Sequence, residues 1–285
     1  MVNKRLEVTE NTKRRIIEYM KEGKRFDDRG LFDYREIEIE TGISNKSEGS
    51  ARVKLGQTEV IAGVKMGIGI PYTDSPDSGV LTVMAELLPL SSSKYESGPP
   101  SDDSIEIARI IDRGIRESEF IDLDKLCITP KKEVWTIFLD IYPINDGGNL
   151  IDAGAMAAVA ALMSAVFPKT EKEGETTKIL FGEFTNKKLP LNEKMPLTMT
   201  FHKLGDQILV DPLTEEEEAS EARLSMAVSI QKKEEFIHAL QKGGKVTFTI
   251  EELHHIFDSM PKVLKKLREN FEEKLKKAEK KAEKK

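Results

Sequence analysis

The spacing of hydrophobic residues changes several times along the chain, and each change marks an expected element. Residues 10–23 (ENTKRRIIEYMKEG) place Ile16, Ile17 and Met20 on one face, which predicts a short amphipathic helix. From Glu36 to Leu87 the pattern becomes strand-like, because short runs alternate polar and apolar residues or are rich in valine and isoleucine. The expected strands are EIEIETG, GSARVKLG, TEVIAGVKMGI and VLTVMAEL.

A polar loop, a helix, a strand and a second helix are predicted next. The loop over residues 90–104 ends in Asp102, Asp103 and Ser104, which are candidate caps for the helix IEIARIIDRGIRES. A strand over 134–144 leads through a glycine turn to the helix DAGAMAAVAALMSAVF. Because that helix is apolar nearly all round and rich in alanine, we expect it to be buried and closely packed.

The second half of the chain shows a similar plan without repeating the residues. Short strands are expected between Thr177 and Met199, followed by the hairpin MTFHKLGDQILVD, the strand RLSMAVSI and a helix from about Lys232. The Lys/Glu-rich stretch from Met260 predicts a solvated helix that frays after about Leu275. Two β-rich layers with long buried helices indicate a mixed α/β (α+β) fold.

These patterns predict three parts. An N-terminal helical extension is expected over residues 1–23, a core over 24–259 and a charged C-terminal helix or tail over 260–285. The core is expected to consist of two halves, 24–168 and 169–259.

Composition narrows the class of protein. The 285 residues are 39% hydrophobic and 33% charged, which is enough apolar material for a core, and the net charge of −6 excludes a chain that is basic throughout. The single cysteine, Cys127, excludes a disulfide framework and a zinc ribbon. The N-terminus lacks a signal-peptide pattern, and the longest nearly uncharged run, Ala153 to Phe167, is too short to cross a bilayer. We therefore expect a soluble cytoplasmic protein without membrane contact.

Two segments carry candidate chemistry. The acidic run over 211–221 (DPLTEEEEASE) is either a solvated helix start or, because Asp211 ends a predicted strand, a carboxylate site for a divalent ion and phosphoryl chemistry. Arg109, Arg113 and Arg116 share one helical face opposite a face of isoleucines, which favours phosphate binding or a subunit contact. No histidine ligand pair is present, so the histidines predict no metal site: His202, His238, His254 and His255.

Five segments, in this order, resemble the RNase PH family. They are RFDDRG, GSARVKLGQTEVIAGV, IEIARIIDRGIR, NDGGN before the alanine-rich helix, and ILVDPLTEEEEASEA. The resemblance covers about residues 24–250 and implies a core of two βαβ-type halves. Within the family the chain most resembles the non-phosphorolytic ring subunit of the archaeal exosome, in which three copies alternate with three copies of an active paralogue.

Active members of the family cleave RNA from its 3′ end with inorganic phosphate, and the resemblance implies that this chain lacks their phosphate site. Their first phosphate-binding arginine falls on Asp103, and the Thr-Arg of their G-G-T-R turn falls on Asn149 and Leu150. Their acidic pair falls on Asp211 and Glu217, the second of which is longer by a methylene.

The size of this loss predicts a subunit that does not catalyse phosphorolysis. Each charge-assisted hydrogen bond to phosphate that is lost removes roughly 1.5–3 kcal/mol. About 1.4 kcal/mol is a factor of ten in rate, so two missing arginines and one added acid predict a loss of several powers of ten.

The resemblance implies instead a role in holding RNA. Arg109, Arg113 and Arg116 match the arginine helix that borders the partner's active site, and we expect them and Lys94 to contact the RNA backbone. The expected partners are the catalytic RNase PH-like subunit in a hexamer (a trimer of heterodimers), RNA-binding cap subunits and RNA. No cofactor is expected.

Two other functions also fit the residues. An active phosphate-dependent 3′→5′ exoribonuclease with a divergent phosphate site would use Asp211 and Glu217 to hold a metal ion. Without the resemblance, a metabolic enzyme of mixed α/β fold would fit as well.

Overall fold

The computed structural model describes residues 8–174, 176–232 and 234–282. The first element in this part of the chain is an amphipathic helix. Helix α1 (Glu10–Lys21) is capped by Thr9, whose hydroxyl accepts from the N–H of Thr12 at 3.3 Å. The sequence predicted this amphipathic helix, and Ile16 and Met20 of its apolar face are buried against Leu204 and Leu209. Residues 1–7 of the expected N-terminal extension lie outside the described residues.

The first half of the core is a six-stranded sheet with the order β1-β2-β3-β6-β4, and β5 pairs with β6. Among the described strands, only β4 and β6 pair in parallel. Helix α2 (Asp102–Glu117) lies in the connection between them, so β4, α2 and β6 form a βαβ unit. A short 3₁₀ turn, η1 (Leu123–Leu126), precedes β5. The strands are β1 (Ile37–Thr41), β2 (Gly49–Leu55), β3 (Thr58–Gly69), β4 (Val80–Ala85), β5 (Cys127–Thr129) and β6 (Glu133–Asn145).

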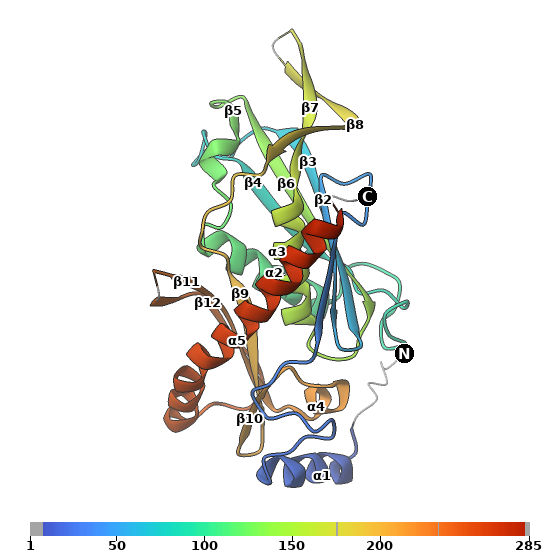
Figure 1. The fold of residues 1–285 in the computed structure, drawn as a ribbon, viewed down its shortest axis with the longest axis vertical. Helices are drawn as coiled ribbons and strands as arrows, with labels where there is room; N and C mark the ends of the chain where they lie inside the picture. The colour runs from blue at the N-terminus through green and yellow to red at the C-terminus, as the bar shows by residue number, and fades with distance from the viewer. Residues whose placement is uncertain (1–7, 175, 233, 283–285) are drawn as a thin grey trace.

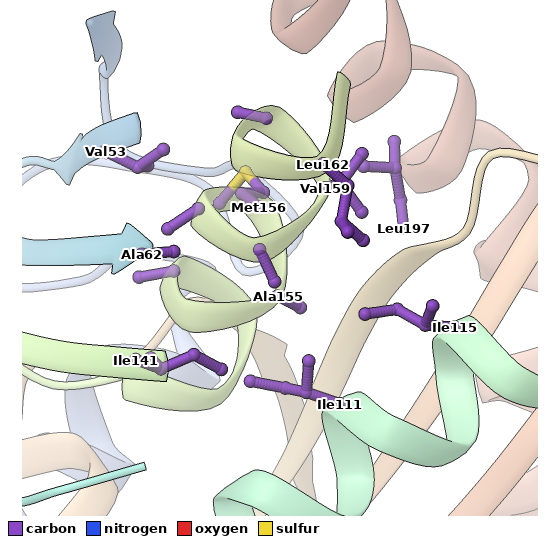
Figure 2. Close-up of a cluster of buried hydrophobic side chains, with 14 of the residues drawn as sticks. Val53, Ala62, Ile111, Ile115, Ile141, Ala155, Met156, Val159, Leu162 and Leu197 are labelled. Atoms are coloured by element: carbon purple, nitrogen blue, oxygen red, sulfur yellow. The ribbon is translucent and has the colours of Figure 1, made fainter. Parts of the chain in front are cut away.

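Helix α3 (Leu150–Ser164) occupies the centre of the molecule, and its residues 150–162 are all buried. Its Met156 faces Val53 and Ala62 of the first sheet, and its other side faces Leu197 and Ile115 (Figure 2). Small residues make this approach close: a Cβ on Gly49 of β2 would lie 2.5 Å from the carbonyl oxygen of Ala161. The alanine-rich composition predicted this buried, tightly packed helix.

The second half of the core contains an antiparallel sheet with the order β10-β9-β11-β12 and a separate β7–β8 hairpin that projects from one end of the molecule (Figure 1). Helix α4 (Thr214–Ala219) connects β10 to β11. The strands are β7 (Val166–Glu173), β8 (Thr176–Lys188), β9 (Leu197–Leu204), β10 (Gln207–Val210), β11 (Ala222–Gln231) and β12 (Glu234–Gly244).

The prediction of a helix from about Lys232 is wrong, because residues 234–244 form β12. A bulge in the β11–β12 pairing leaves His238 as an extra residue between Ile237 and Ala239. The bulge shifts the alternation of apolar positions, so the spacing of Phe236, Ile237 and Leu240 imitates a helical face.

The C-terminal helix α5 (Ile250–Ala282) is longer and more firmly packed than predicted. It begins ten residues before the expected boundary and does not fray after Leu275, since Leu275 is 3% exposed and Ala278 is 5% exposed. The helix packs against β1, β9 and α3 (Figure 1). Lys274 Nζ lies 3.3 Å from a carboxylate oxygen of Glu36. Within the described ranges, no helix has the length and apolar character needed to cross a membrane.

Candidate functional site

A buried cluster of charged side chains surrounds Asp211, which directly follows β10. Arg35 donates to both carboxylate oxygens, from Nη2 to Oδ1 at 2.6 Å and from Nε to Oδ2 at 2.9 Å. Arg29 Nη1 donates to Oδ2 at 2.9 Å, and Asn149 Nδ2 donates to Oδ1 at 2.9 Å. Two arginines therefore balance this carboxylate, which ties the segment before β1 to the second sheet.

A second buried ion pair holds the same segment from the other side. Arg25 forms a bidentate pair with Glu216 of α4, in which Nε donates to Oε1 at 2.9 Å and Nη2 donates to Oε2. The guanidinium also donates to the carbonyl oxygens of Val210 and Asp211, at 3.0 and 2.7 Å. The cluster thus fixes both ends of the acidic turn between β10 and α4.

The glycine turn before α3 is held against this cluster by its carbonyl groups. Arg35 Nη1 donates to Gly147 O at 2.8 Å, and Gly148 O accepts from Thr58 Oγ1 at 2.6 Å. Asn149 is the N-cap of α3 in the left-handed region, and its side chain points inward to Asp211 and Asp152. The next residue, Leu150, is buried. The turn therefore presents no cationic side chain.

Glu217 accepts a hydrogen bond from the backbone N–H at the start of α3. Its Oε2 accepts from the N–H of Asn149 at 3.1 Å. The first N–H groups of a helix are natural anion-binding donors, so the chain's own carboxylate stands where an external anion would bind. Burial raises the pKa of Glu217 to about 7, with a further contribution from Asp146, while the Asn149 N–H and Lys94 act in the opposite direction.

The raised pKa predicts a pH-dependent stability. Because the folded state takes up the Glu217 proton near pH 7 and the unfolded state near its ordinary value of 4.5, wild-type stability gains from Glu217 as pH falls from about 7 to 4.5. The difference in unfolding free energy between wild type and Glu217→Gln should therefore change across this window, measured by urea denaturation at each pH. A constant difference from pH 8 to pH 4.5 would contradict the assignment.

The loop that contains Lys94 is fastened to the same turn. Lys94 Nζ lies 2.6 Å from Asp146 Oδ2, and the Tyr95 hydroxyl donates to that oxygen at 2.7 Å. The other oxygen, Oδ1, accepts from the N–H of Gly148 at 3.1 Å. Lys94 is thus engaged within the chain.

Asp103 lies exposed in the first turn of α2. The N-cap of this helix is Ser101, one residue before the predicted caps.

The three arginines of α2 are all exposed, but they differ in their contacts. Arg116 pairs with Asp112 at 2.5 Å and donates to Leu81 O at 3.0 Å, which covers part of the β4 edge. Arg113 has one weak contact, 3.4 Å to Gln241 Oε1. Arg109 makes no ion pair or side-chain hydrogen bond with any other described residue.

Comparison with known proteins agrees with this architecture. The models for domains 1 and 2 of the 3′ exoribonuclease (RNase PH) family match residues 33–168 and 194–258. The chain belongs to the RNase PH family. It is 43% identical over 264 residues to the exosome complex component Rrp42 of Pyrococcus horikoshii, covering 92% of this chain and 94% of that protein.

Other members show the same relationship. The Rrp42 component of Methanothermobacter thermautotrophicus is 44% identical over 254 residues, covering 89% of this chain and 91% of that protein. A solved structure, the Archaeoglobus fulgidus exosome with RNA bound to the active site, contains a chain that is 38% identical. It superposes with a TM-score of 0.80, covering 91% of this chain and 97% of that one. The RNase PH fold predicted from the sequence is confirmed.

Within this RNase PH fold, the structure gathers some predicted site residues and separates others. Asn149, Asp211 and Glu217 meet in one cluster, with Leu150 beside them, whereas the arginines of α2 lie apart. The sequence reasoning missed Arg25, Arg29 and Arg35 as partners of the acidic turn. Two of them stand in the segment RFDDRG, where several charged residues close together were the available signal.

Proposed function

We propose that this chain is a non-catalytic ring subunit of an archaeal exosome, which shapes the active site of a catalytic paralogue and contributes arginines to the RNA path. The likeness to named exosome components supports the assembly. The observation that carries the non-catalytic role is the turn at Asn149 and Leu150, where the N–H donor is taken by Glu217 and no cation faces outward.

The acidic residues support the same conclusion. A metal-assisted site would require a carboxylate that is free to coordinate, whereas Asp211 is matched by Arg29 and Arg35. Within the described ranges, no group of three or more His, Cys, Asp or Glu side chains is arranged to hold a metal ion.

Arg109 and Arg113 are the RNA contacts that we propose. Both are exposed, and their guanidinium groups are not committed to an internal acid. Phosphate contacts position RNA without reading its sequence, so these residues would serve any RNA that enters the partner's site. Arg116 has an internal role at the β4 edge and Lys94 is held by Asp146, so we assign neither a principal part in RNA binding.

Replacing Arg109 and Arg113 with Glu should weaken RNA binding and degradation by the assembled ring about equally for many sequences. The slope of binding against salt should become shallower by about one unit or less for each lost phosphate contact. Binding is measured by fluorescence anisotropy over a range of salt concentrations, with the ring assembled from this chain and the co-expressed catalytic subunit.

Arg14→Glu with Arg15→Glu is the matched control, because both residues are exposed on α1 and the change in charge is the same. Sedimentation of each sample checks that the ring is intact. An intact ring with wild-type affinity after the α2 substitutions would refute the RNA role. A ring that falls apart would assign these arginines to assembly instead.

Leu150→Arg alone should not create phosphorolysis. Leu150 is buried, Glu217 still occupies the Asn149 N–H and Asp103 still repels an anion, so a single arginine restores one feature among several. Release of nucleoside diphosphates from RNA by the isolated subunit is the measurement. Strong phosphate-dependent release would show that the site is intact apart from this residue.

A further inference from the structure

Asp152 is a fully buried carboxylate in the first turn of α3, and it accepts four hydrogen bonds. Its Oδ2 accepts from the Tyr34 hydroxyl at 2.8 Å, from Asn149 Nδ2 at 3.1 Å and from the N–H of Thr200 at 3.1 Å. Its Oδ1 accepts from the Thr200 hydroxyl at 2.8 Å. These donors lie before β1, at the start of α3 and on β9 of the second sheet. Asp152 therefore stands at a joint between the two halves of the core.

This carboxylate lacks the counter-charge that its neighbour Asp211 has. Among the residues that the structure describes, no cationic side chain forms an ion pair with Asp152, whereas Arg29 and Arg35 pair with Asp211. Asn149 Nδ2 lies between the two carboxylates and donates to both. Two buried like charges this close disfavour double ionisation, so the one without an arginine takes up a proton first. Burial accordingly raises the pKa of Asp152 to about 6, although its hydrogen bonds act in the opposite direction.

Two hydroxyl groups allow Asp152 to bind a proton without losing a hydrogen bond. Thr200 Oγ1 lies 2.8 Å from Asp152 Oδ1 and 3.0 Å from Ser225 Oγ, and either hydroxyl can donate in the second contact. When Asp152 is ionised, Thr200 donates to it and Ser225 donates to Thr200. When a proton binds to Oδ1, Asp152 donates it to Thr200 Oγ1, and the Thr200 hydroxyl turns to donate to Ser225. Ser225 lines a small cleft beside Arg113, so the hydroxyl chain leads toward the surface.

Other charged and titratable groups surround the joint. Besides Tyr34 and Asp211 they are Arg35 of the segment before β1, His202 of β9, Glu217 of α4 and Arg223 of β11. Burial lowers the pKa of His202 to about 3, so this ring is neutral from pH 8 to pH 4.5. Burial raises the pKa of Glu217 to about 7, so a test of Asp152 must remove this second group. The other elements on α3 contribute apolar side chains, among them Val53, Ala62, Ile111 and Ile141 (Figure 2).

We propose that Asp152 is a proton-operated joint: one proton removes its buried charge and strengthens the attachment of α3 to β9 and to the segment before β1. The ionised form accepts all four hydrogen bonds but leaves a charge without a counter-ion in the protein interior, which weakens the folded state. The neutral form keeps these contacts through the reversed hydroxyls. Because the unfolded chain takes up this proton only near the ordinary value of 3.8, the fold gains stability from Asp152 as pH falls from about 6 to 3.8.

NMR of the full chain labelled with carbon-13 aspartate measures this proton directly, and through-bond correlation to the backbone assigns the Asp152 carboxyl. We expect a titration midpoint near pH 6. Thr200→Val removes a donor that favours the ionised form, so it should raise the midpoint by about one pH unit, a tenfold change in proton affinity. Thr198→Val is the matched control and should leave the midpoint unchanged. Thr198 is buried two residues earlier on β9, whereas the hydrogen bonds to Asp152 come from Thr200.

Urea denaturation tests whether the proton acts on the joint. In the Glu217→Gln background, the unfolding constant of Asp152→Asn relative to that of the parent should rise at least about tenfold between pH 8 and pH 4.5, because only the parent gains stability there. Asp206→Asn changes an exposed aspartate in the same background, and its ratio should stay constant.

A constant ratio for Asp152→Asn, or a carboxyl midpoint below about pH 4.5 in the wild-type chain, would overturn the proposal. Equal midpoints in the two valine variants would show that the Thr200 hydroxyl does not serve the carboxylate. If Asp152→Asn does not fold, the titration of the wild-type chain decides. Each measurement uses this chain alone, so its outcome is independent of the proposed ring.

Discussion

An asparagine in place of Asp211 should lower the free energy of unfolding by about 3–5 kcal/mol, the usual cost of removing one partner from a buried ion pair. Asp211 is fully buried, and its carboxylate accepts from Arg29, Arg35 and Asn149. The substitution leaves Arg35 without its counter-charge, and Arg29 keeps only Asp27. Asparagine is the informative replacement because it tolerates the left-handed backbone at this position (φ 50°), so the loss reports the charge rather than the conformation.

Urea denaturation at neutral pH measures this loss, and Asp206→Asn is the matched control. Asp206 lies exposed in the turn between β9 and β10, so the same chemical change there should alter stability by less than about 0.5 kcal/mol. Equal midpoints for the two variants would mean that the cluster around Asp211 does not hold the segment before β1 to the second sheet.

Elements with regular patterns were predicted well from the sequence. In β1 and β3, buried residues alternate with exposed or half-buried ones, and α3 has no polar face, so in each case one local pattern corresponds to one structure. The β9–β10 hairpin was also found, because its two apolar runs flank Gly205 and Asp206.

The errors occurred where tertiary packing decides the structure. In β12 a bulge at His238 breaks the two-residue alternation of apolar side chains, and the local sequence does not predict this bulge. In α5, Leu275 and Ala278 are surrounded by lysines and glutamates, so the sequence suggests a solvated tail. The helix is ordered because β1 and α3 bury its narrow apolar stripe, and both elements are far from it in the sequence.

For the candidate site as well, the sequence identified some residues but could not predict their contacts. The resemblance picked out Asn149, Leu150 and Asp211, but the identity of a residue does not reveal its partners. That Arg35 pairs with Asp211 depends on contacts across 176 positions of sequence. The different roles of Arg109 and Arg116 likewise depend on Asp112 and the β4 edge, although both share one helical face.

Alanine in place of Gly148 should be among the most destabilising single substitutions in the protein, with a loss of more than about 3 kcal/mol, because backbone strain and overpacking combine. Gly148 has a φ of 89°, and an added Cβ would lie 2.6 Å from Pro212 O and 2.8 Å from Thr214 N. These are backbone atoms of the acidic turn, which Arg25 and Arg35 hold in place, so the turn cannot yield without breaking buried ion pairs.

Gly174→Ala separates the two contributions. Gly174 has a φ of 67° and no atom within 4 Å of its added Cβ, so this variant carries the conformational cost of roughly 1–2 kcal/mol without any collision. The excess loss in Gly148→Ala therefore measures how rigidly the glycine turn and the acidic turn are packed together. If the two variants lost equal stability, the turn before α3 would be free to move, and Glu217 would not be fixed on the Asn149 N–H, where it takes the place of an anion.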